Sequence, residues 1–327
     1  MGVNVMSKIL VTAIGSFSAD IVIKTLKAHG HYVIGSDTYP KAWIADSYNV
    51  NEFIQAPYAT NKEEYINYIE KVCMEHKIDF VFPLIDLEVD ILSSEKNRFL
   101  EKGIVICVSD GDSIKLIRNK YNLMRFLSDK GFKEVIPTKL IKESTEFGMP
   151  VFIKPISGRS SEGCRAIFNK LEFQCMKSIL PENEYIVQPL IEGKIITVDV
   201  VRNPSTNQVV SICRRELLRN KSGAGITVEM IDNAELEALC AFISEKVGVI
   251  GTVNFEFIEG NDGKYHFLEI NPRFSGGVEF SHIAGYDVVY NHLLCFMNKE
   301  IEKKPIIKKA IIVKKYEEYI TEYTNDN

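Results

Sequence analysis

Two alternating segments on either side of residue 262 restrict the fold of this chain more than any other feature. Residues 253–260 and 266–273 place apolar and polar side chains in turn, as strands with one buried face do. The linking residues 261–264, Asn-Asp-Gly-Lys, contain the Asp-Gly pair typical of a two-residue hairpin turn. A hairpin that pairs 261 with 264 sets Glu256 directly opposite Glu269.

This pairing gives the predicted hairpin one apolar and one polar face. The apolar face stacks two cross-strand pairs, Phe255 on Ile270 and Phe257 on Leu268. The polar face holds Glu256, Glu269 and Asn271, although like charges opposite each other destabilise a sheet. A hard cation explains the arrangement, because Mg²⁺ prefers oxygen ligands and keeps positions open for phosphates. A solvent-facing hairpin with hydrated glutamates is the alternative.

Composition narrows the class of protein. The 327 residues exceed what one hydrophobic core usually serves, so two or three domains are expected. The net charge of -5 argues against nucleic-acid binding, which needs a basic excess. The sequence has no apolar run near 20 residues, no signal-peptide pattern and no myristoylation motif, so no membrane association is expected. The seven cysteines form no CxxC pair, which indicates a reduced, cytoplasmic protein.

The N-terminal part predicts a small doubly wound sheet. Residues 8–13, 21–28 and 32–37 read as strand, helix and strand, and the alternation continues to about residue 112. The turn after the first strand lacks the second and third glycines of the G-x-G-x-x-G dinucleotide motif. A nicotinamide oxidoreductase is therefore disfavoured, and Asp37 is interpreted as a turn residue or a substrate-side group.

The middle of the chain carries two lysines and a loop of small residues. One helix is predicted over 113–127, with Lys120 off its apolar stripe, and a strand over 149–155 that ends at Lys154. The loop 157–164 follows, and its backbone N–H groups and hydroxyls could cradle phosphate oxygens. The small residues of this loop that we assign to that role are Gly158, Ser160, Ser161 and Gly163.

The third part predicts more strands. A hairpin is expected from 184–191 and 195–201, with its turn at Glu192-Gly193. A strand over 209–215 and a helix over 234–247 precede the hairpin that carries the glutamates. After Pro305 a lysine-rich tail contains one strand-like run, and its charges are interpreted as a solvated face.

Six segments occur in an order that resembles the ATP-grasp superfamily. They are Lys120, Pro-Val-Phe-Ile-Lys154-Pro, the Gly/Ser loop, Val-Gln188-Pro-Leu-Ile-Glu-Gly, Asn-Phe-Glu256-Phe and Leu-Glu269-Ile-Asn271-Pro-Arg273. The resemblance is nearest to the branch around the carbamoyl-phosphate synthase large subunit and the carboxylate-amine ligases. Phe82-Pro83 with Asp86 and Glu88 is similar to a short motif in that branch's preceding domain.

The resemblance implies a mixed fold of α/β and α+β type. A doubly wound pre-ATP-grasp domain is expected over residues 1–112 and an ATP-grasp domain over 113–300. The latter comprises subdomain A, about 113–187, and subdomain B, about 188–300. Residues 301–327 are left as a basic strand and tail.

The resemblance also implies the nucleotide and metal site. Lys120 and Lys154 would hold the α- and β-phosphates of ATP, and the loop 157–164 would close over the β- and γ-phosphates. Arg273 and Lys154 would be the catalytic cations. The metal ligands would be Glu256, Glu269 and Asn271, holding two Mg²⁺ ions, with Mn²⁺ as an alternative.

The resemblance also places the nucleoside. Gln188 and the backbone of Leu190 would contact adenine, with Ile191 and Glu192 beside them. The acidic residue that usually accepts the ribose hydroxyls is replaced by Ile195, which leaves open whether Glu192 takes over that role.

The implied reaction is the joining of a small-molecule carboxylate to an amine, with amino acids as the expected partners. A carboxylate attacks the γ-phosphorus of ATP, and the amine displaces phosphate from the resulting acylphosphate. Arg273 and the backbone of Ser275-Gly276-Gly277 could stabilise the oxyanion, unless these glycines form an ordinary loop. A basic cluster of Arg214, Arg215, Arg219 and Lys221 could bind a substrate carboxylate, unless it is a solvated surface.

Two alternatives remain within the ATP-grasp interpretation. One is a carbamoyl-phosphate-synthase-like kinase acting on bicarbonate or carbamate, and the other is an ATP-binding regulatory module. A single ATP-grasp unit without a duplicated half favours the amide ligase. The identities of the acid and the amine cannot be derived from the motifs, and a homodimer is compatible with the sequence.

Overall fold

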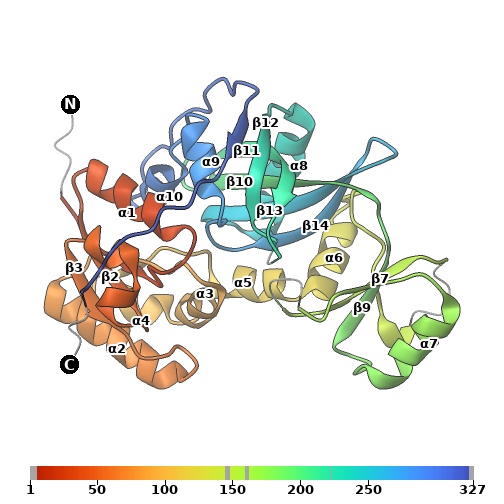
Figure 1. Ribbon diagram of the computed structural model, residues 1–327, viewed down its shortest axis with the longest axis horizontal. Coiled ribbons are helices and arrows are strands. Elements are labelled where there is room, and N and C mark those ends of the chain that lie inside the picture. Colours follow the sequence, from red (N-terminus) through yellow and green to blue (C-terminus); the bar gives the residue numbers. More distant parts are fainter. Residues whose placement is uncertain (1–5, 144–147, 159–161, 222, 324–327) are drawn as a thin grey trace.

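The computed structural model describes residues 6–143, 148–158, 162–221 and 223–323 of the chain. Within these residues it contains a five-stranded, a four-stranded and a six-stranded sheet. Figure 1 shows the five-stranded sheet at one end of the molecule, the four-stranded sheet at the other and the six-stranded sheet between them. The predicted fold class, a parallel α/β domain followed by an ATP-grasp-like arrangement of antiparallel sheets, is confirmed.

The N-terminal sheet is parallel, with the order β3-β2-β1-β4-β5. Its strands are β1 (Lys8–Thr12), β2 (Tyr32–Asp37), β3 (Glu52–Gln55), β4 (Phe80–Phe82) and β5 (Val105–Ile106). Its helices are α1 (Ala19–Ala28), α2 (Lys62–His76), α3 (Asp86–Ser93) and α4 (Lys96–Leu100), with 3-10 turns η1 (Lys41–Trp43) and η2 (Ala45–Tyr48). The predicted doubly wound sheet is confirmed. The edge strand β3 was not predicted, because all of its side chains are at least partly exposed and it has no buried apolar run.

Glu88 is a buried acid at the carboxyl edge of this sheet. Its two carboxylate oxygens accept hydrogen bonds from Thr12 Oγ1 (2.5 Å) and the Tyr65 hydroxyl (2.7 Å). Burial, with a smaller contribution from the charge of Asp37, raises the pKa of Glu88 from 4.5 to about 7. The proton is therefore held more tightly in the folded than in the unfolded chain.

We expect Glu88→Gln to remove a pH dependence of stability. A carboxyl group whose pKa is raised by folding stabilises the folded state fully below about pH 4.5. This stabilisation, about 3 kcal/mol in free energy of unfolding, is lost as the pH rises through about 7. The difference in free energy of unfolding, wild type minus Glu88→Gln, should fall by that amount over this pH range. Urea titrations of both proteins at several pH values measure it, and a difference that does not vary with pH would contradict the assignment.

The prediction of one continuous helix over 113–127 is wrong. The structure has two helices, α5 (Gly111–Arg118) and α6 (Lys120–Asp129), separated by Asn119 in an extended conformation. The Asn119 side chain accepts from the Asn122 backbone N–H at 2.9 Å and so caps α6. The Lys120 N–H bonds to the carbonyl of Ile156 at 3.0 Å. The break places Lys120 in the first turn of a new helix, next to the strand that carries Lys154.

The four-stranded sheet has the order β6-β9-β7-β8. Its elements are β6 (Lys139–Leu140), η3 (Ile141–Glu143), β7 (Val151–Pro155), β8 (Arg165–Ile167), α7 (Lys170–Ile179) and β9 (Tyr185–Pro189). A small core unites the sheet with the apolar side of α7, through Phe173 and Met176 against Val151 and Ile167. This sheet carries Lys154 and Gln188 on neighbouring strands.

The six-stranded sheet is antiparallel, with the order β14-β13-β10-β11-β12-β15. Its strands are β10 (Gly193–Asn203), β11 (Gln208–Arg219), β12 (Gly225–Ile231), β13 (Gly251–Gly260), β14 (Tyr265–Asn271) and β15 (Ile311–Val313). Its helices are α8 (Ala234–Val247), α9 (Val278–Ile283) and α10 (Val288–Phe296).

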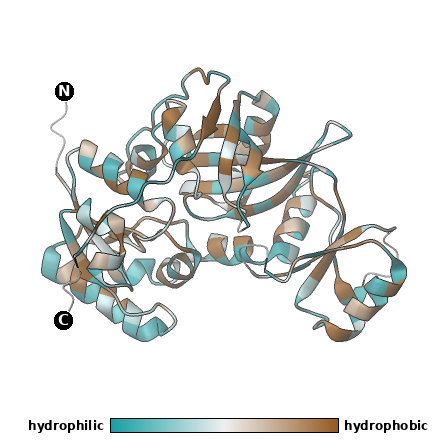
Figure 2. Ribbon diagram, in the orientation of Figure 1, coloured by the Kyte–Doolittle hydropathy of each residue, from teal (hydrophilic) through white to brown (hydrophobic). Residues whose placement is uncertain are grey.

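Both faces of the six-stranded sheet are used. One face packs on α5, α6 and α8 in a core that includes Ile117, Leu127, Phe255 and Phe267. The other face shares a core with α1, α9 and α10. Figure 2 shows hydrophobic residues along these strands and hydrophilic residues over much of α2. Within the described parts of the chain, no helix combines the length and apolar character needed to cross a bilayer.

The hairpin predicted from 184–191 and 195–201 is wrong. β9 lies in the four-stranded sheet and β10 in the six-stranded sheet, so Glu192-Gly193 is a crossover between sheets. A Cβ at Gly193 would lie 2.2 Å from the Glu259 carbonyl oxygen, so this glycine permits close approach of β13. Both segments have strand character, but the partner of each is chosen by packing far along the chain.

The hairpin of β13 and β14 pairs Glu256 with Glu269, as predicted, but by a different route. The Gly260 N–H bonds to the Lys264 carbonyl at 2.9 Å, so the loop has three residues instead of two. Phe257 pairs with Phe267, which corrects the predicted stacking on Leu268. A bulge at Leu268 then shifts the register back by one residue. The one-residue shift from the longer loop and the opposite shift from the bulge cancel, so Glu256 and Glu269 are paired as predicted.

Candidate functional site

Two carboxylates and an amide gather where the middle of β13 pairs with the end of β14. Glu256 lies opposite Glu269, and the Asn271 amide donates to Glu269 Oε1 at 3.4 Å. Burial and the negative charge of Glu269 raise the pKa of Glu256 to about 7. The structure thus brings together the three residues predicted as metal ligands, in surroundings that oppose uncompensated negative charge.

Two lysines approach these carboxylates from outside the hairpin. Lys154, at the end of β7, is 3% exposed, and its Nζ lies 3.5 Å from the carbonyl of the bulge residue Leu268. Burial lowers the pKa of Lys154 to about 8, although the charge of Glu269 opposes this. Lys120 Nζ lies 3.8 Å from Glu269 Oε2 and donates to the Gly158 carbonyl at 3.2 Å. The lysines and carboxylates therefore meet between the two antiparallel sheets.

These residues fit a magnesium–nucleotide site. Across the described residues, no three His, Cys, Asp or Glu side chains converge as a protein-only metal site. Two carboxylates and an amide leave several coordination positions for phosphate oxygens and water, which is how Mg²⁺ is usually held with nucleotides. Arg219 Nη2 bonds Glu256 Oε2 at 2.9 Å and so balances part of the negative charge.

Arg273 is held by the N-terminal domain. Its Nε donates to Asp86 Oδ1 at 3.0 Å, and Arg118 Nη1 lies 2.8 Å from the same oxygen. Burial raises the pKa of Asp86, but the charges of Arg273 and Arg118 outweigh it and lower the pKa overall. Asp86 therefore orients the predicted catalytic arginine, a link between residues 187 positions apart that the sequence did not reveal.

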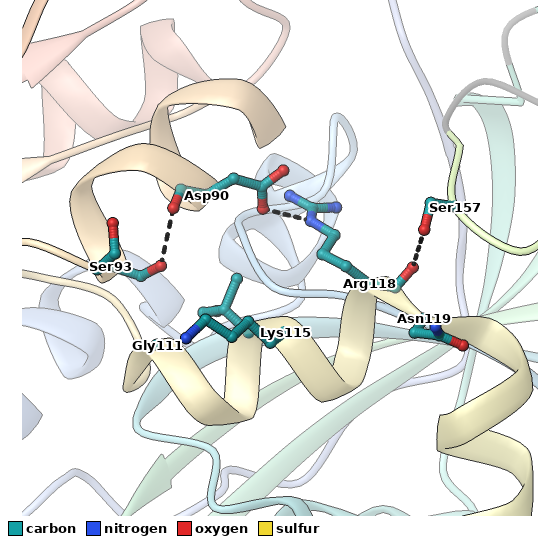
Figure 3. Close-up of a pocket in the computed structure, with 9 residues that line it drawn as sticks. Asp90, Ser93, Gly111, Lys115, Arg118, Asn119 and Ser157 are labelled. Carbon is teal, nitrogen blue, oxygen red and sulfur yellow. Dashed lines mark hydrogen bonds and ion pairs between the residues drawn. The ribbon is translucent and has the colours of Figure 1, made fainter. Parts of the chain in front are cut away.

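A cavity of about 340 Å³ lies between α3, α5 and Ser157, the first residue of the predicted phosphate loop. In Figure 3, Arg118 reaches Asp90 across the cavity, and Ser157 points to the Arg118 carbonyl. Among the described residues, its lining includes neither Lys154 nor Glu269. The cavity thus adjoins the carboxylate–lysine site and is separate from it.

The residues predicted around adenine lie at the crossover between the sheets. Gln188 is buried on β9, and its Nε2 donates to Thr138 Oγ1 at 2.8 Å. The Leu190 N–H is already bonded to the Pro150 carbonyl at 3.1 Å. Ile191 and Ile195 are half-buried and Glu192 is exposed. The assignment of these residues to the nucleoside stays a prediction.

The predicted phosphate loop lies only partly within the described residues. Ser160 and Ser161 fall outside them. Gly163 has a positive φ of 72°, and a Cβ there would lie 3.0 Å from Pro155 Cγ, so glycine is required at this turn.

The four residues of the predicted basic cluster do not lie together on one surface, and their role in substrate binding stays a prediction. Arg214 and Arg215 are successive residues of β11 and project to opposite faces. Arg215 binds Glu229 and Glu259. Arg214 is buried with its side chain 1% exposed, and Arg219 is paired with Glu256, while Lys221 stands exposed on the following loop. The arginines are therefore neutralised separately.

Arg214 belongs to a buried network centred on Asp199. Arg214 Nη1 donates to Asp199 at 2.6 Å, and Ser275 and Ser281 donate to the same carboxylate at 2.8 and 2.7 Å. Arg214 Nη2 also reaches Ser275 Oγ at 3.0 Å. The network fixes the start of the predicted substrate loop Ser275-Gly276-Gly277. Sequence reasoning missed Asp199, although a charged residue in the buried strand β10 is itself a signal.

A second missed residue, Glu216, lies two positions after Arg214 on β11. Its side chain is 2% exposed, and its Oε1 lies 3.4 Å from Arg214 Nε. Among the described residues, four buried polar atoms on β10 and β11 have no hydrogen-bond partner: Thr197 Oγ1, Arg214 Nε, Glu216 Oε2 and Arg219 Nε. Because buried polar atoms are nearly always bonded, this group indicates a place for ligand or water groups.

Two family models match separate parts of the chain. Residues 9–107 match the family described as "PylC-like, N-terminal domain", and residues 182–319 match "ATP-grasp in the biosynthetic pathway with Ter operon".

Solved structures show the same fold. The N5-carboxyaminoimidazole synthetase of Staphylococcus aureus is 20% identical, with a TM-score of 0.76 over 94% of this chain and 82% of that chain. Biotin carboxylase of Campylobacter jejuni is 18% identical, with a TM-score of 0.77 over 94% of this chain and 74% of that chain. Pyruvate carboxylase of Rhizobium etli is 19% identical, with a TM-score of 0.75 over 90% of this chain, which spans only 29% of that protein. The chain therefore carries a PylC-like N-terminal domain followed by an ATP-grasp domain.

Proposed function

We propose that the protein is an ADP-forming carboxylate–amine ligase that works through an acylphosphate. The observation that carries this proposal is the pair Glu256 and Glu269, with Asn271, facing Lys120 and Lys154 between the two antiparallel sheets. This is the set of charges that phosphoryl transfer from a magnesium nucleotide requires, because that reaction depends on positioning and charge neutralisation.

Each residue has a defined part in the first step. Bound Mg²⁺ neutralises charge on the phosphates, and Glu256, Glu269 and Asn271 would hold it. Lys154 and Lys120 place positive charge beside the same carboxylates, which suits them to bind the phosphates of ATP. A substrate carboxylate attacks the γ-phosphorus and forms the acylphosphate while ADP leaves.

The second step would take place over the loop Ser275-Gly276-Gly277. Asp199 and Arg214 fix Ser275, so the backbone N–H groups of this loop are held in place to stabilise the oxyanion. The Glu216 carboxylate, with one oxygen unpaired, is suited to receive the entering amine. The acid and the amine are proposed to be amino acids, in a cytoplasmic protein that could form a homodimer.

A second candidate has bicarbonate as the carboxylate substrate. One similar structure, the biotin carboxylase domain of Hydrogenobacter thermophilus 2-oxoglutarate carboxylase, was solved in complex with MgADP and bicarbonate. That domain is 17% identical to this chain. The product would then be a carbamate or carbamoyl phosphate in place of an amide.

The products of turnover test the proposal. Purified protein with MgATP is screened against pairs of amino acids, and against bicarbonate with each amine. ADP, orthophosphate, AMP and pyrophosphate are measured. The ligase predicts ADP and orthophosphate in equal amounts, dependent on a carboxylate, and hydroxylamine should trap the intermediate as a hydroxamate. AMP and pyrophosphate would refute the acylphosphate route, and no turnover with any pair would favour the regulatory module.

A further inference from the structure

The C-terminal segment connects the six-stranded sheet to the N-terminal domain. β15 pairs antiparallel with β12, and the Lys314 N–H extends this pairing to the Ile226 carbonyl at 2.8 Å. Seven residues later, the Thr321 carbonyl accepts from the Tyr48 hydroxyl at 2.7 Å, and Thr321 Oγ1 donates to the Ala42 carbonyl at 2.5 Å. Figure 1 shows this segment running from β15 to the side of the N-terminal sheet.

Lys314 in this segment is not the solvated charge expected from the sequence. Its Nζ donates to the Gly276 carbonyl at 2.6 Å. The same ammonium lies 5.7 Å from the ring centroid of Phe17 and 5.8 Å from that of Phe280. Burial lowers the pKa of Lys314, and the charge of Glu279 opposes this. The ammonium is thus held between two aromatic rings and one backbone carbonyl.

Each glycine of the substrate loop is closely packed. A Cβ at Gly276 would lie 3.3 Å from Phe17 Cβ, and one at Gly277 would lie 2.9 Å from the Phe280 ring and 3.3 Å from Arg214 Nη2. The Asp199 network therefore contacts this loop at Ser275, while Lys314 and Phe17 contact it at Gly276. Phe17 comes from the turn after β1, so three separate parts of the chain meet here.

The position of Lys314 separates it from the nucleotide site. In the sheet order, β15 and β14 are the two outer strands, with four strands between them. Glu269 and its lysines lie at the β14 edge, while the loop after β14 crosses the sheet toward Arg214 and Lys314. Replacing Lys314 should therefore impair the amine-accepting step more than it impairs ATP binding.

We propose that Lys314 is a positioning residue that orients the loop Ser275-Gly276-Gly277, so that the C-terminal segment forms part of the acceptor site. The role in amine transfer rests on the proposed ligase function. The effect on the loop itself does not.

The experiment compares Lys314→Met with Lys315→Met in the full chain. Lys315 is the neighbouring lysine, its side chain is 81% exposed, and it pairs with Glu317, so it is a matched control. Hydrogen exchange of the peptide covering residues 274–280 is measured in both variants and in wild type. We expect faster exchange by about tenfold in Lys314→Met only, since an opening free energy lower by about 1.4 kcal/mol speeds exchange by that factor. Equal exchange in all three proteins overturns the proposal.

Turnover supplies the functional measurement. An equimolar mixture of the twenty amino acids serves as acid and amine, and the ratio of ADP to amide product is determined. The KM for MgATP and the rate of ADP release should stay within about twofold of wild type in Lys314→Met, while the ratio of ADP to amide rises about fivefold or more. Lys314→Arg, which can still donate to Gly276, should recover part of the coupling. An unchanged ratio in Lys314→Met overturns the acceptor-site role.

A further variant, Phe17→Ala, tests the same contact without a substitution in the six-stranded sheet. Phe17 is 58% exposed, so Phe17→Ala removes one side of the Lys314 contact without opening a core. It should raise exchange of the same peptide in the same direction, and unchanged exchange would count against the proposal. If wild type releases no ADP with any amino acid, the ligase function fails, while the exchange data still decide whether Lys314 positions the loop.

Discussion

Glu269→Gln is expected to lower Mg²⁺-dependent ATP turnover by a factor on the order of 10³ while the protein stays folded. Glu269 lies opposite Glu256 and bonds Asn271, so its charge is central to the predicted metal site. Without a cation, the two carboxylates repel each other, which is one reason that the pKa of Glu256 is raised to about 7. The neutral amide should therefore leave the free energy of unfolding unchanged or slightly higher.

The measurement combines ADP release with denaturant unfolding. Glu259→Gln is the matched control, because Glu259 is on the same strand as Glu256 but binds Arg215, away from the lysines. It should keep wild-type turnover. Wild-type turnover in Glu269→Gln would show that the hairpin does not hold the metal, and loss of folding would show that the carboxylate is structural.

Asp199→Ala is expected to have the largest effect on stability, a loss of about 3–5 kcal/mol in free energy of unfolding. Asp199 is fully buried and is the acceptor for Arg214, Ser275 and Ser281. Its removal leaves the Arg214 charge buried without its main partner, because Glu216 lies 3.4 Å from Nε and forms no hydrogen bond there. Ser275→Ala removes one hydroxyl only and should cost about 1 kcal/mol.

A double variant separates the charge from the packing. Replacing Asp199 by Leu and Arg214 by Met removes both charges, so it should be less destabilised than Asp199→Ala alone. Urea unfolding of Asp199→Leu, Arg214→Met and the double variant gives the coupling free energy. Strictly additive effects would mean that the pair does not interact, and would remove the argument that it fixes the substrate loop.

Much of the secondary structure follows from local pattern. The predicted limits of β2 and α8 agree with the structure, because their apolar periodicity is strong and their ends are marked by capping or turn residues. One failed prediction is the single helix over 113–127. Asn119 interrupts an apolar stripe that continues through it, since its side chain caps the second helix and the N–H of Lys120 bonds to Ile156, just after β7. The pairing of Glu256 with Glu269 was predicted correctly through an incorrect turn, since the bulge at Leu268 compensates for the longer loop.

The sequence by itself determined the parallel N-terminal sheet and the carboxylate–amide set of β13 and β14, because these depend on spacing within short segments. The resemblance to the ATP-grasp superfamily came from the order of six segments along the chain. Only the tertiary structure decided which sheet β9 and β10 join, that Asp86 holds Arg273, and that Asp199 and Lys314 hold the substrate loop at Ser275 and Gly276. The physical reason is that strand periodicity specifies which face a side chain occupies, but not which distant residue meets it there. Those partners are selected by packing and by the need of each buried charge for a counter-charge, which act between residues far apart in the chain.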